Sequence, residues 1–365
     1  MRAELARLLV LTAVLTGGCG GSSPTEPTVP SPPPQTPAPP APQPPAPTPP
    51  QPTPPTPPPP QPPPPGRSVT GFTIDAVSDA PVPNVAIRVA DVGETTSAAD
   101  GSFSVAASDP EQIREVSLSS SSTVQRITRM RVPGPSARVT LMPTSLDLRA
   151  FDEMFRAGGS LQRWTSVPRV VVQSRVLQFT NVADMEYVAT SQVMSDAEVS
   201  GLLGDLNYGL PQITGNSFGG FAGEEREQAT EGERVSVSRG GYIVVARYEG
   251  LTAATGYWGY GRWATSGGQV IRGIIMLDRG FDTSGSPFRR SLRIHELGHA
   301  LGYNHVTVRE SVMNSSARSE PNAFDRDAAR IAFLRPPLNR SPDVDPDPFS
   351  ANLRAPAMMV WKGDR

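Results

Sequence analysis

The sequence predicts a multidomain protein in which a small antiparallel β-sandwich is followed by an α+β domain. Short segments of alternating apolar and polar residues, separated by turn residues, fill residues 67–144 and are typical of a sandwich. Residues 145–340 mix helical and strand patterns and carry their polar residues on a late helix, which favours an α+β arrangement. The 42 prolines of the 365 residues are concentrated ahead of both regions, so part of the chain cannot pack into a core.

The charge balance argues against nucleic acid as a partner. The formal net charge is −2 and the sequence pI is about 6.0. No cluster of Lys and Arg forms a stripe that could follow a phosphate backbone. The chain has one cysteine, Cys19, so it can form no internal disulfide.

Residues 1–19 have the pattern of an export signal. A basic start precedes an apolar run from Leu8 to Leu15 that is too short to span a bilayer. The string LTGGC that ends at Cys19 resembles the lipobox of bacterial lipoproteins, in which the cysteine becomes the lipidated first residue of the mature protein. The resemblance implies a membrane anchor at Cys19 and a location outside the cytoplasm, in the bacterial cell envelope. A secreted protein whose signal contains a cysteine by chance is the alternative.

Residues 20–66 predict a disordered, Pro-rich linker. From residue 24 to residue 65 the sequence is mostly Pro with Thr, Ala and Gln, and it has no apolar pattern. Such a segment extends as polyproline II at ~3.1 Å per residue and can reach on the order of 100 Å. We expect a spacer between membrane and domains. The alternative, a ligand for proline-binding domains, fits poorly with export.

The sandwich region contains no residues that suggest chemistry. The pair Asp100-Gly101 predicts a two-residue hairpin turn. Strands are predicted at residues 69–74, 85–90, 102–107 and 137–142. The run VTGFTIDAVSDAPVPNVAIRVADVGETTSAADGSFSV resembles the carboxypeptidase regulatory-like, or transthyretin-like, domain that is often appended to exported bacterial enzymes. A spacer or a substrate-binding accessory is expected here.

Helix caps and apolar periodicity define the elements of the α+β region. Ser145 can cap a helix over residues 145–156, and Ser195 with Glu198 forms a capping box for a helix over 195–213. Buried strands are predicted at residues 169–173, 234–238, 242–248 and 270–277.

All three histidines of the chain lie in the stretch RIHELGHALGYNH, residues 293–305. His295 and His299 are four residues apart, so on a helix they project from one face and can share one ion. Glu296 follows directly and can act as a general base toward water. Gly302 can adopt a positive φ, end the helix and turn the chain, which would bring His305 to the same ion.

This pattern predicts one catalytic Zn²⁺. Three neutral imidazoles leave a fourth position open for water, whose pKa falls to about 7 at such sites. The other interpretation is three polar residues that lie close together on an ordinary helix. A bare H-E-x-x-H arises by chance in some proteins, but the added Gly302 and His305 complete H-E-x-x-H-x-x-G-x-x-H, which is far rarer.

The segment resembles the metzincin clan of zinc endopeptidases, and HELGHALGYNH looks most like its matrixin-type members. The resemblance implies a zincin-type catalytic domain, with His295, His299 and His305 as zinc ligands. It also implies a methionine turn below the site, which Met313 in ESVMNSS supplies. A closing helix is expected over residues 322–337, with Ala328, Ile331, Ala332 and Leu334 on its apolar face.

By the same resemblance, one strand upstream of the zinc helix lies at the sheet edge and pairs with extended substrate. Residues 268–280 are the candidate, although their continuous apolar run equally fits a central strand. The chain departs from family patterns elsewhere: it has no cysteine switch, no tyrosine soon after Met313 and no histidine left for a second zinc.

Two further motifs are better explained without chemistry. GNSFG, residues 215–219, matches the serine-hydrolase elbow, but it has no spare histidine, so a flexible loop around Ser217 is expected. PDVDPDP, residues 342–348, invites a Ca²⁺ site but lacks the EF-hand Gly and Glu; a solvated acidic tail over 341–365 is expected.

Together these features predict an exported zinc metalloendopeptidase whose partners are protein or peptide substrates. The alternative is a surface binding or adhesion lipoprotein built on a zincin-like scaffold. A binding scaffold has no need of Glu296, so the sequence favours the enzyme.

Overall fold

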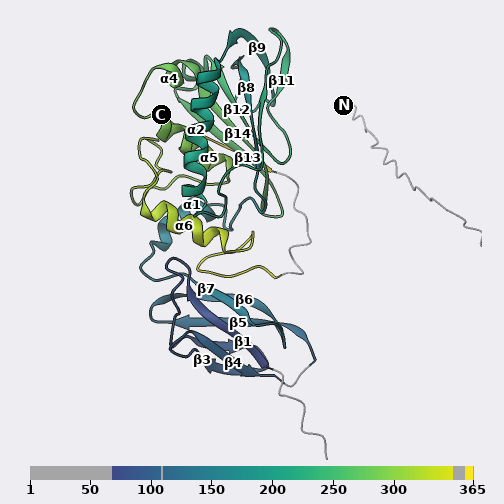
Figure 1. The fold of residues 1–365 in the computed structure, drawn as a ribbon, viewed down its shortest axis with the longest axis vertical. Coiled ribbons are helices and arrows are strands. Elements are labelled where there is room, and N and C mark those ends of the chain that lie inside the picture. The colour runs from purple at the N-terminus through teal and green to yellow at the C-terminus, as the bar shows by residue number, and fades with distance from the viewer. Residues whose placement is uncertain (1–67, 108–109, 348–357, 365) are drawn as a thin grey trace, which may run out of the picture. The chain divides into compact units, whose positions relative to one another are not determined.

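A computed structural model describes residues 68–107, 110–347 and 358–364 (Figure 1). These residues form a mostly β-sheet structure with a few helices, arranged in three sheets. They all belong to one compact unit, Pro62–Arg365. The predicted signal segment, the lipidation site Cys19 and the Pro-rich linker lie outside the described residues. Among the described residues, no helix combines the length and apolar character needed to cross a bilayer.

The first two sheets form the sandwich. Their strands are β1 (Ser68–Asp75), β2 (Ala86–Val89), β3 (Gly93–Thr96), β4 (Ser102–Ala106), β5 (Gln112–Ser120), β6 (Thr123–Val132) and β7 (Ala137–Leu141). One sheet has the order β4-β1-β7 and the other β3-β2-β5-β6. Alternate residues of most of these strands, such as Ile87 and Val89 of β2, fill the core between the two sheets.

The four strands predicted in this region are present as β1, β2, β4 and β7, but two details are corrected. The sandwich is not wholly antiparallel, because β1 pairs with β7 in parallel. Asp100-Gly101 forms a local turn with Gly101 at φ 78°, yet β3 and β4 on either side belong to different sheets, so there is no hairpin. A turn residue reports local backbone geometry and carries no information about which strands pair.

The third sheet has eight strands. They are β8 (Arg169–Gln178), β9 (Glu186–Val193), β10 (Glu224–Glu227), β11 (Arg234–Ser236), β12 (Tyr242–Glu249), β13 (Gly259–Ser266), β14 (Gln269–Asp278) and β15 (Met358–Asp364). Their order is β11-β9-β8-β12-β14-β13-β15, with β10 paired to β8. The centre, β8-β12-β14, is parallel, whereas β13 runs antiparallel to β14.

Strand β14 corrects the expectation that residues 268–280 could form the sheet edge. It lies between β12 and β13 and is buried along most of its length. Its run of apolar residues is continuous because both faces of the strand are buried, as is usual for strands in the centre of such a sheet. The strand outside it, β13, was not predicted because its glycines and polar residues interrupt the apolar pattern.

Six helices accompany the sheet: α1 (Leu148–Arg156), α2 (Asp196–Ile213), α3 (Leu251–Thr255), α4 (Arg279–Thr283), α5 (Arg289–Ala300) and α6 (Ala323–Phe333). Residues of α1, α2, α5 and α6 form one core with alternate residues of the central strands. Among these are Val170 of β8, Ile243 of β12 and Ile275 of β14. On the opposite face of the sheet, side chains such as Tyr187 of β9 and Val244 of β12 form a second core with Leu251 of α3. Helices α2 and α5 lie over one face of the sheet (Figure 1).

The helix caps agree with the sequence in one case and differ in another. Ser195 and Glu198 form the predicted capping box of α2. Helix α1 is capped by Asp147, whose side chain accepts a hydrogen bond from the Ala150 N–H, so the prediction of Ser145 was wrong by two residues. Helix α6 ends before Leu334, and that side chain is exposed, contrary to its predicted place on the apolar face.

The expectation of a solvated acidic tail is wrong at Asp343. Asp343 is fully buried, and both of its oxygens accept hydrogen bonds from Arg335, at 2.7 Å each. The Arg335 guanidinium helps hold the pKa of Asp343 below its ordinary value, even though burial alone would raise it. Residues 358–364 then add β15 to the third sheet. A buried arginine partner and a sheet edge are long-range features that the local sequence of residues 341–365 does not reveal.

Candidate metal centre

Helix α5 carries the first two histidines, and its end delivers the third. The Gly302 N–H donates to the His299 carbonyl at 2.9 Å, and the Tyr303 N–H donates to the Gly298 carbonyl at 3.0 Å, so the last turn is closed on itself. Gly302 has φ 105°, a conformation that L residues with a Cβ rarely adopt. The predicted helix-ending turn is therefore present, and the chain beyond it brings His305 back over the helix.

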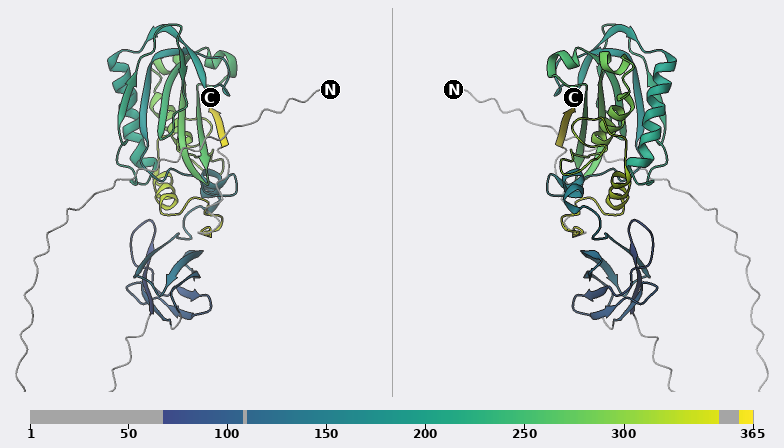
Figure 2. Two further views of the ribbon diagram at one scale, coloured as in Figure 1. Left: turned by 90° about the vertical axis from the view of Figure 1, so that its right-hand side faces the viewer. Right: turned by 90° about the vertical axis from the view of Figure 1, so that its left-hand side faces the viewer.

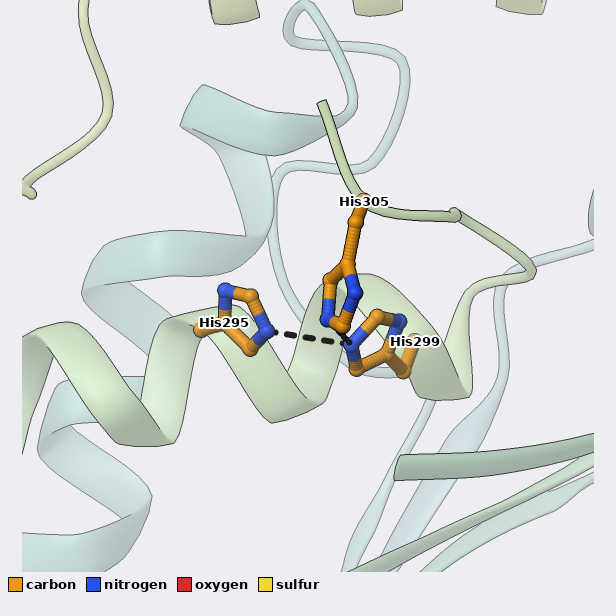
Figure 3. Close-up of side chains that lie close together, drawn as sticks. All are labelled: His295, His299 and His305. Carbon is orange, nitrogen blue, oxygen red and sulfur yellow. Dashed lines mark hydrogen bonds between the residues drawn. The ribbon is translucent and has the colours of Figure 1, made fainter. Parts of the chain in front are cut away.

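The three histidines meet at one point (Figure 3). The Nε2 atoms of His295 and His299 are 3.0 Å apart, and those of His299 and His305 are 3.2 Å apart. One ligand nitrogen from each residue lies within 4.8 Å of the others. His295 and His299 are fully buried, whereas His305 is partly exposed, so the cluster opens to solvent on its side.

Backbone carbonyls orient two of the rings. His295 Nδ1 lies 2.6 Å from the Val312 carbonyl oxygen, and His299 Nδ1 lies 2.7 Å from the Tyr303 carbonyl oxygen. A carbonyl accepts only, so each Nδ1 must carry the proton and donate it. Each Nε2 is then left with its lone pair, the form in which imidazole binds a metal.

This arrangement fits a tetrahedral metal ion. Zn–N bonds of about 2.0–2.1 Å at tetrahedral angles separate neighbouring ligand nitrogens by about 3.3 Å. The observed separations of 3.0 and 3.2 Å are close to that value. Two Nε2 lone pairs facing each other at 3.0 Å repel unless a cation lies between them, so the ring orientations themselves favour a shared ion. The cluster could hold a metal ion, and imidazole nitrogens are ligands for several transition metals, zinc, copper, iron and nickel among them.

Glu296 follows His295 directly on α5, and its side chain lies against strand β13. Its side chain is fully buried and lies against Gly259 of β13: a Cβ built on Gly259 would fall 2.2 Å from Glu296 Oε1. Burial of a carboxylate beside a polar cluster is costly unless the group has a function or a partner there. The glycine makes the room that this carboxylate occupies.

Strand β13 forms a wall of the site that the sequence analysis missed. Gly261 faces His299 so closely that a Cβ would fall 2.0 Å from the His299 Cβ. Two residues on, the Trp263 ring is stacked parallel to the His299 ring at 6.3 Å between centroids, and its Nε1 donates to Gln162 at 3.0 Å. The sequence does contain a signal for this contact, because glycines at alternate positions of a strand mark a close approach by another backbone.

Met313 lies under the helix. It is fully buried, and its sulfur would fall 2.4 Å from a Cβ built on Gly298, the residue before His299. The Val306 N–H donates to the Met313 carbonyl at 2.9 Å, which ties this turn to the segment that carries His305. Asp325 of α6 holds the same turn, since it accepts from the Val312 N–H at 3.0 Å.

A buried ion network fixes the other face of α5. Asp282 of α4 accepts two hydrogen bonds from Arg293 of α5, both at 2.8 Å, and a third from Arg247 of β12 at 2.6 Å. Arg293 also donates to Asp205 of α2 at 2.8 Å. The helix that carries His295 is thereby joined to two helices and the central sheet. Loss of one member of such a buried network leaves an uncompensated charge.

Ser217 does not have the surroundings of a hydrolase nucleophile. It is exposed and follows helix α2, whereas an elbow serine sits between a strand and a helix. The site that the structure does assemble consists of residues from α5, the following turn and β13.

Comparison with protein families and with curated proteins assigns no function to this site. No protein-family model matches the chain, and no curated protein matches it either.

Proposed function

We propose that this chain is a zinc-dependent endopeptidase of the metzincin type that acts on extracytoplasmic proteins. The observation that carries the proposal is the convergence of three histidine Nε2 atoms, at 3.0 and 3.2 Å, two of them on a helix that also carries a buried glutamate. Zn²⁺ bound there would supply a Lewis acid for the substrate carbonyl and lower the pKa of water.

The residues of the chain have separate parts in this proposal. His295, His299 and His305 would hold the ion, and the Val312 and Tyr303 carbonyls keep two of the rings in the metal-binding tautomer. Glu296 accepts a proton from the attacking water and passes it to the leaving amine.

The proposal includes an extracytoplasmic location. Its support is the lipobox-like string before Cys19 and the Pro-rich segment after it. A lipid at Cys19 would anchor the chain, and the linker would carry the two folded regions away from the membrane. Mass spectrometry of the protein from cells would detect the acylated Cys19 at the mature N-terminus if this is correct.

The histidine content allows a sharp test of the metal site. Because the chain has only three histidines, a histidine-labelled protein gives three sets of imidazole signals in NMR, all from this site. One equivalent of Zn²⁺ should shift all three sets together. Residues 20–365 would be used, so that no lipid is attached.

Activity is tested on the same protein with labelled, unfolded casein. Wild type should bind one zinc and cleave casein, and Glu296→Ala should bind one zinc and cleave at least about 100-fold more slowly. Zinc bound by both proteins with cleavage by neither, across varied substrates, would instead favour a binding or adhesion protein. A wild type that takes up no zinc would exclude a zinc site in the enzyme and in the binding protein alike.

A further inference from the structure

Strand β15 occupies the outer edge of the third sheet (Figure 2). It pairs antiparallel with β13 along seven residues, from Met358 opposite Thr265 to Asp364 opposite Gly259. At ~3.4 Å per residue the pairing covers about 24 Å of the edge. Most of β13 is therefore paired on both sides, with β14 inside and β15 outside.

The edge that β15 covers is a natural binding surface for an extended polypeptide. The outer side of a terminal strand presents a row of backbone N–H and C=O groups that another strand can satisfy. Peptides bind proteins in this way by adding a strand, and backbone hydrogen bonds supply the affinity. Here a strand of the same chain takes that place.

This edge runs beside the candidate metal centre. Gly259 lies against Glu296 and Gly261 lies against His299. In each case a Cβ on the glycine would overlap the neighbouring side chain. In the register of β13 with β15, Asp364 stands opposite Gly259 and Lys362 stands opposite Gly261. The backbone of β15 thus passes one strand spacing, about 4.8 Å, from the residues that touch the base and a metal ligand.

We infer that β15 is an intramolecular competitor for substrate, so that the chain restrains its own site until this strand leaves β13. The inference rests on the proposed function, because it assumes that the polypeptide to be cleaved pairs with β13. The occupant is the segment Met358–Asp364 of this chain, joined to the described fold through residues 348–357.

The covalent connection explains why a short strand can compete. A segment tethered by a short linker has an effective concentration in the millimolar range near its site. A free substrate at micromolar concentration then meets an edge that is mostly occupied. If the strand is paired about nine-tenths of the time, the apparent affinity for substrate falls about tenfold.

Paired variants separate backbone pairing from other effects of mutation. Successive N–H groups of a strand point to opposite sides, so Val360→Pro with Trp361→Pro removes one donor that faces β13. Val360→Ala with Trp361→Ala keeps both donors and is the matched control. A chain ending at residue 357 serves as a second variant that removes the strand completely.

Hydrogen exchange of β13 amides tests the pairing without any need for activity. The double-proline and truncated proteins should exchange the outward amides of residues 259–266 at least about tenfold faster than the double-alanine protein, while the amides of β12 stay protected. Equal exchange in all three proteins would overturn the inference.

Binding of labelled casein tests the competition, again without cleavage. The zinc-loaded Glu296→Ala protein is used as background and anisotropy gives the affinity. The double-proline and truncated forms should bind casein about tenfold more tightly than the double-alanine form. Faster exchange in β13 with unchanged casein affinity would overturn the inference even if the enzyme is active. If no form cleaves casein, the proposed function fails, while this comparison still decides whether β15 blocks the edge.

Discussion

Gly261 of β13 and His299 of α5 meet where only a glycine fits, since a Cβ on Gly261 would fall 2.0 Å from the Cβ of His299. Sheet and helix therefore touch through backbone at the position of a metal ligand. Neither element can shift without moving the imidazole that His299 contributes.

Gly261→Ala should accordingly weaken zinc binding as well as folding. The methyl group forces β13 and α5 apart, and overpacking of this kind costs typically about 1–3 kcal/mol. Gly240→Ala is the matched control, because nothing lies within 4 Å of a Cβ at that position. Urea unfolding and competition with a fluorescent zinc chelator measure the two effects. Similar zinc affinity in both variants would show that the contact does not position His299.

Gly302→Ala tests the turn that delivers His305. Gly302 has φ 105°, and its Cβ would lie 2.8 Å from Val270 Cγ2. Gly285 also has a positive φ, 74°, but nothing surrounds its Cβ position. Both alanine variants should lose about 1–2 kcal/mol of stability through backbone strain. Only Gly302→Ala should lower zinc affinity, by at least about tenfold, as chelator competition would reveal; an equal loss in Gly285→Ala would contradict this account of the turn.

Met313 and Gly298 should be energetically coupled. Met313→Ala removes a buried side chain beneath the helix, at a cost of about 2–5 kcal/mol, and Gly298→Ala places a methyl group against the Met313 sulfur. In the double variant the new methyl group enters the space that the sulfur has left. The free energy of unfolding should therefore fall by about 1 kcal/mol less than the sum of the single effects. Additive effects would mean that the turn carrying Met313 can move away from α5 without a cost in free energy.

Stability should fall in acid partly through Glu198. The Ser195 backbone N–H, and then the Arg247 guanidinium, lower the pKa of Glu198 to about 2 against burial, which opposes them. A carboxyl with a depressed pKa stabilises the fold fully above its unfolded value, near 4.5, and loses that contribution as pH falls toward 2. Because the side chain is partly exposed, we expect about 1 kcal/mol. The stability difference between wild type and Glu198→Gln, measured by urea unfolding, should be largest above pH 5 and shrink toward pH 2.

The local parts of the site could be predicted from the sequence. Spacing along a helix determines which side chains share a face, so the four-residue interval between His295 and His299 is enough to pair them, and Gly302 is enough to mark the turn. The capping box of α2 is equally local. Each of these depends on residues within about four positions of one another.

The parts that depend on pairing between distant segments could not be predicted. Strand β13 has too few apolar residues to be recognised as a strand from the sequence. Its alternate glycines, Gly259 and Gly261, signal a close backbone approach, but only the structure shows that α5 is the element that approaches. Residues 358–364 belong to the sheet through a partner about 100 positions away. Asp343 was expected in solvent because its buried partner, Arg335, is invisible in the local pattern.

The most direct test of the central claim is kcat/KM for casein cleavage by zinc-loaded wild type and Glu296→Gln. Glutamine has nearly the same volume as glutamate but cannot accept the proton, so the fold and the zinc content should be unchanged. We predict a loss of at least about 100-fold in kcat/KM with one zinc per chain in both proteins. Equal rates in the two proteins would contradict the assignment of Glu296 as the base, and a wild type without zinc would contradict the metal centre itself.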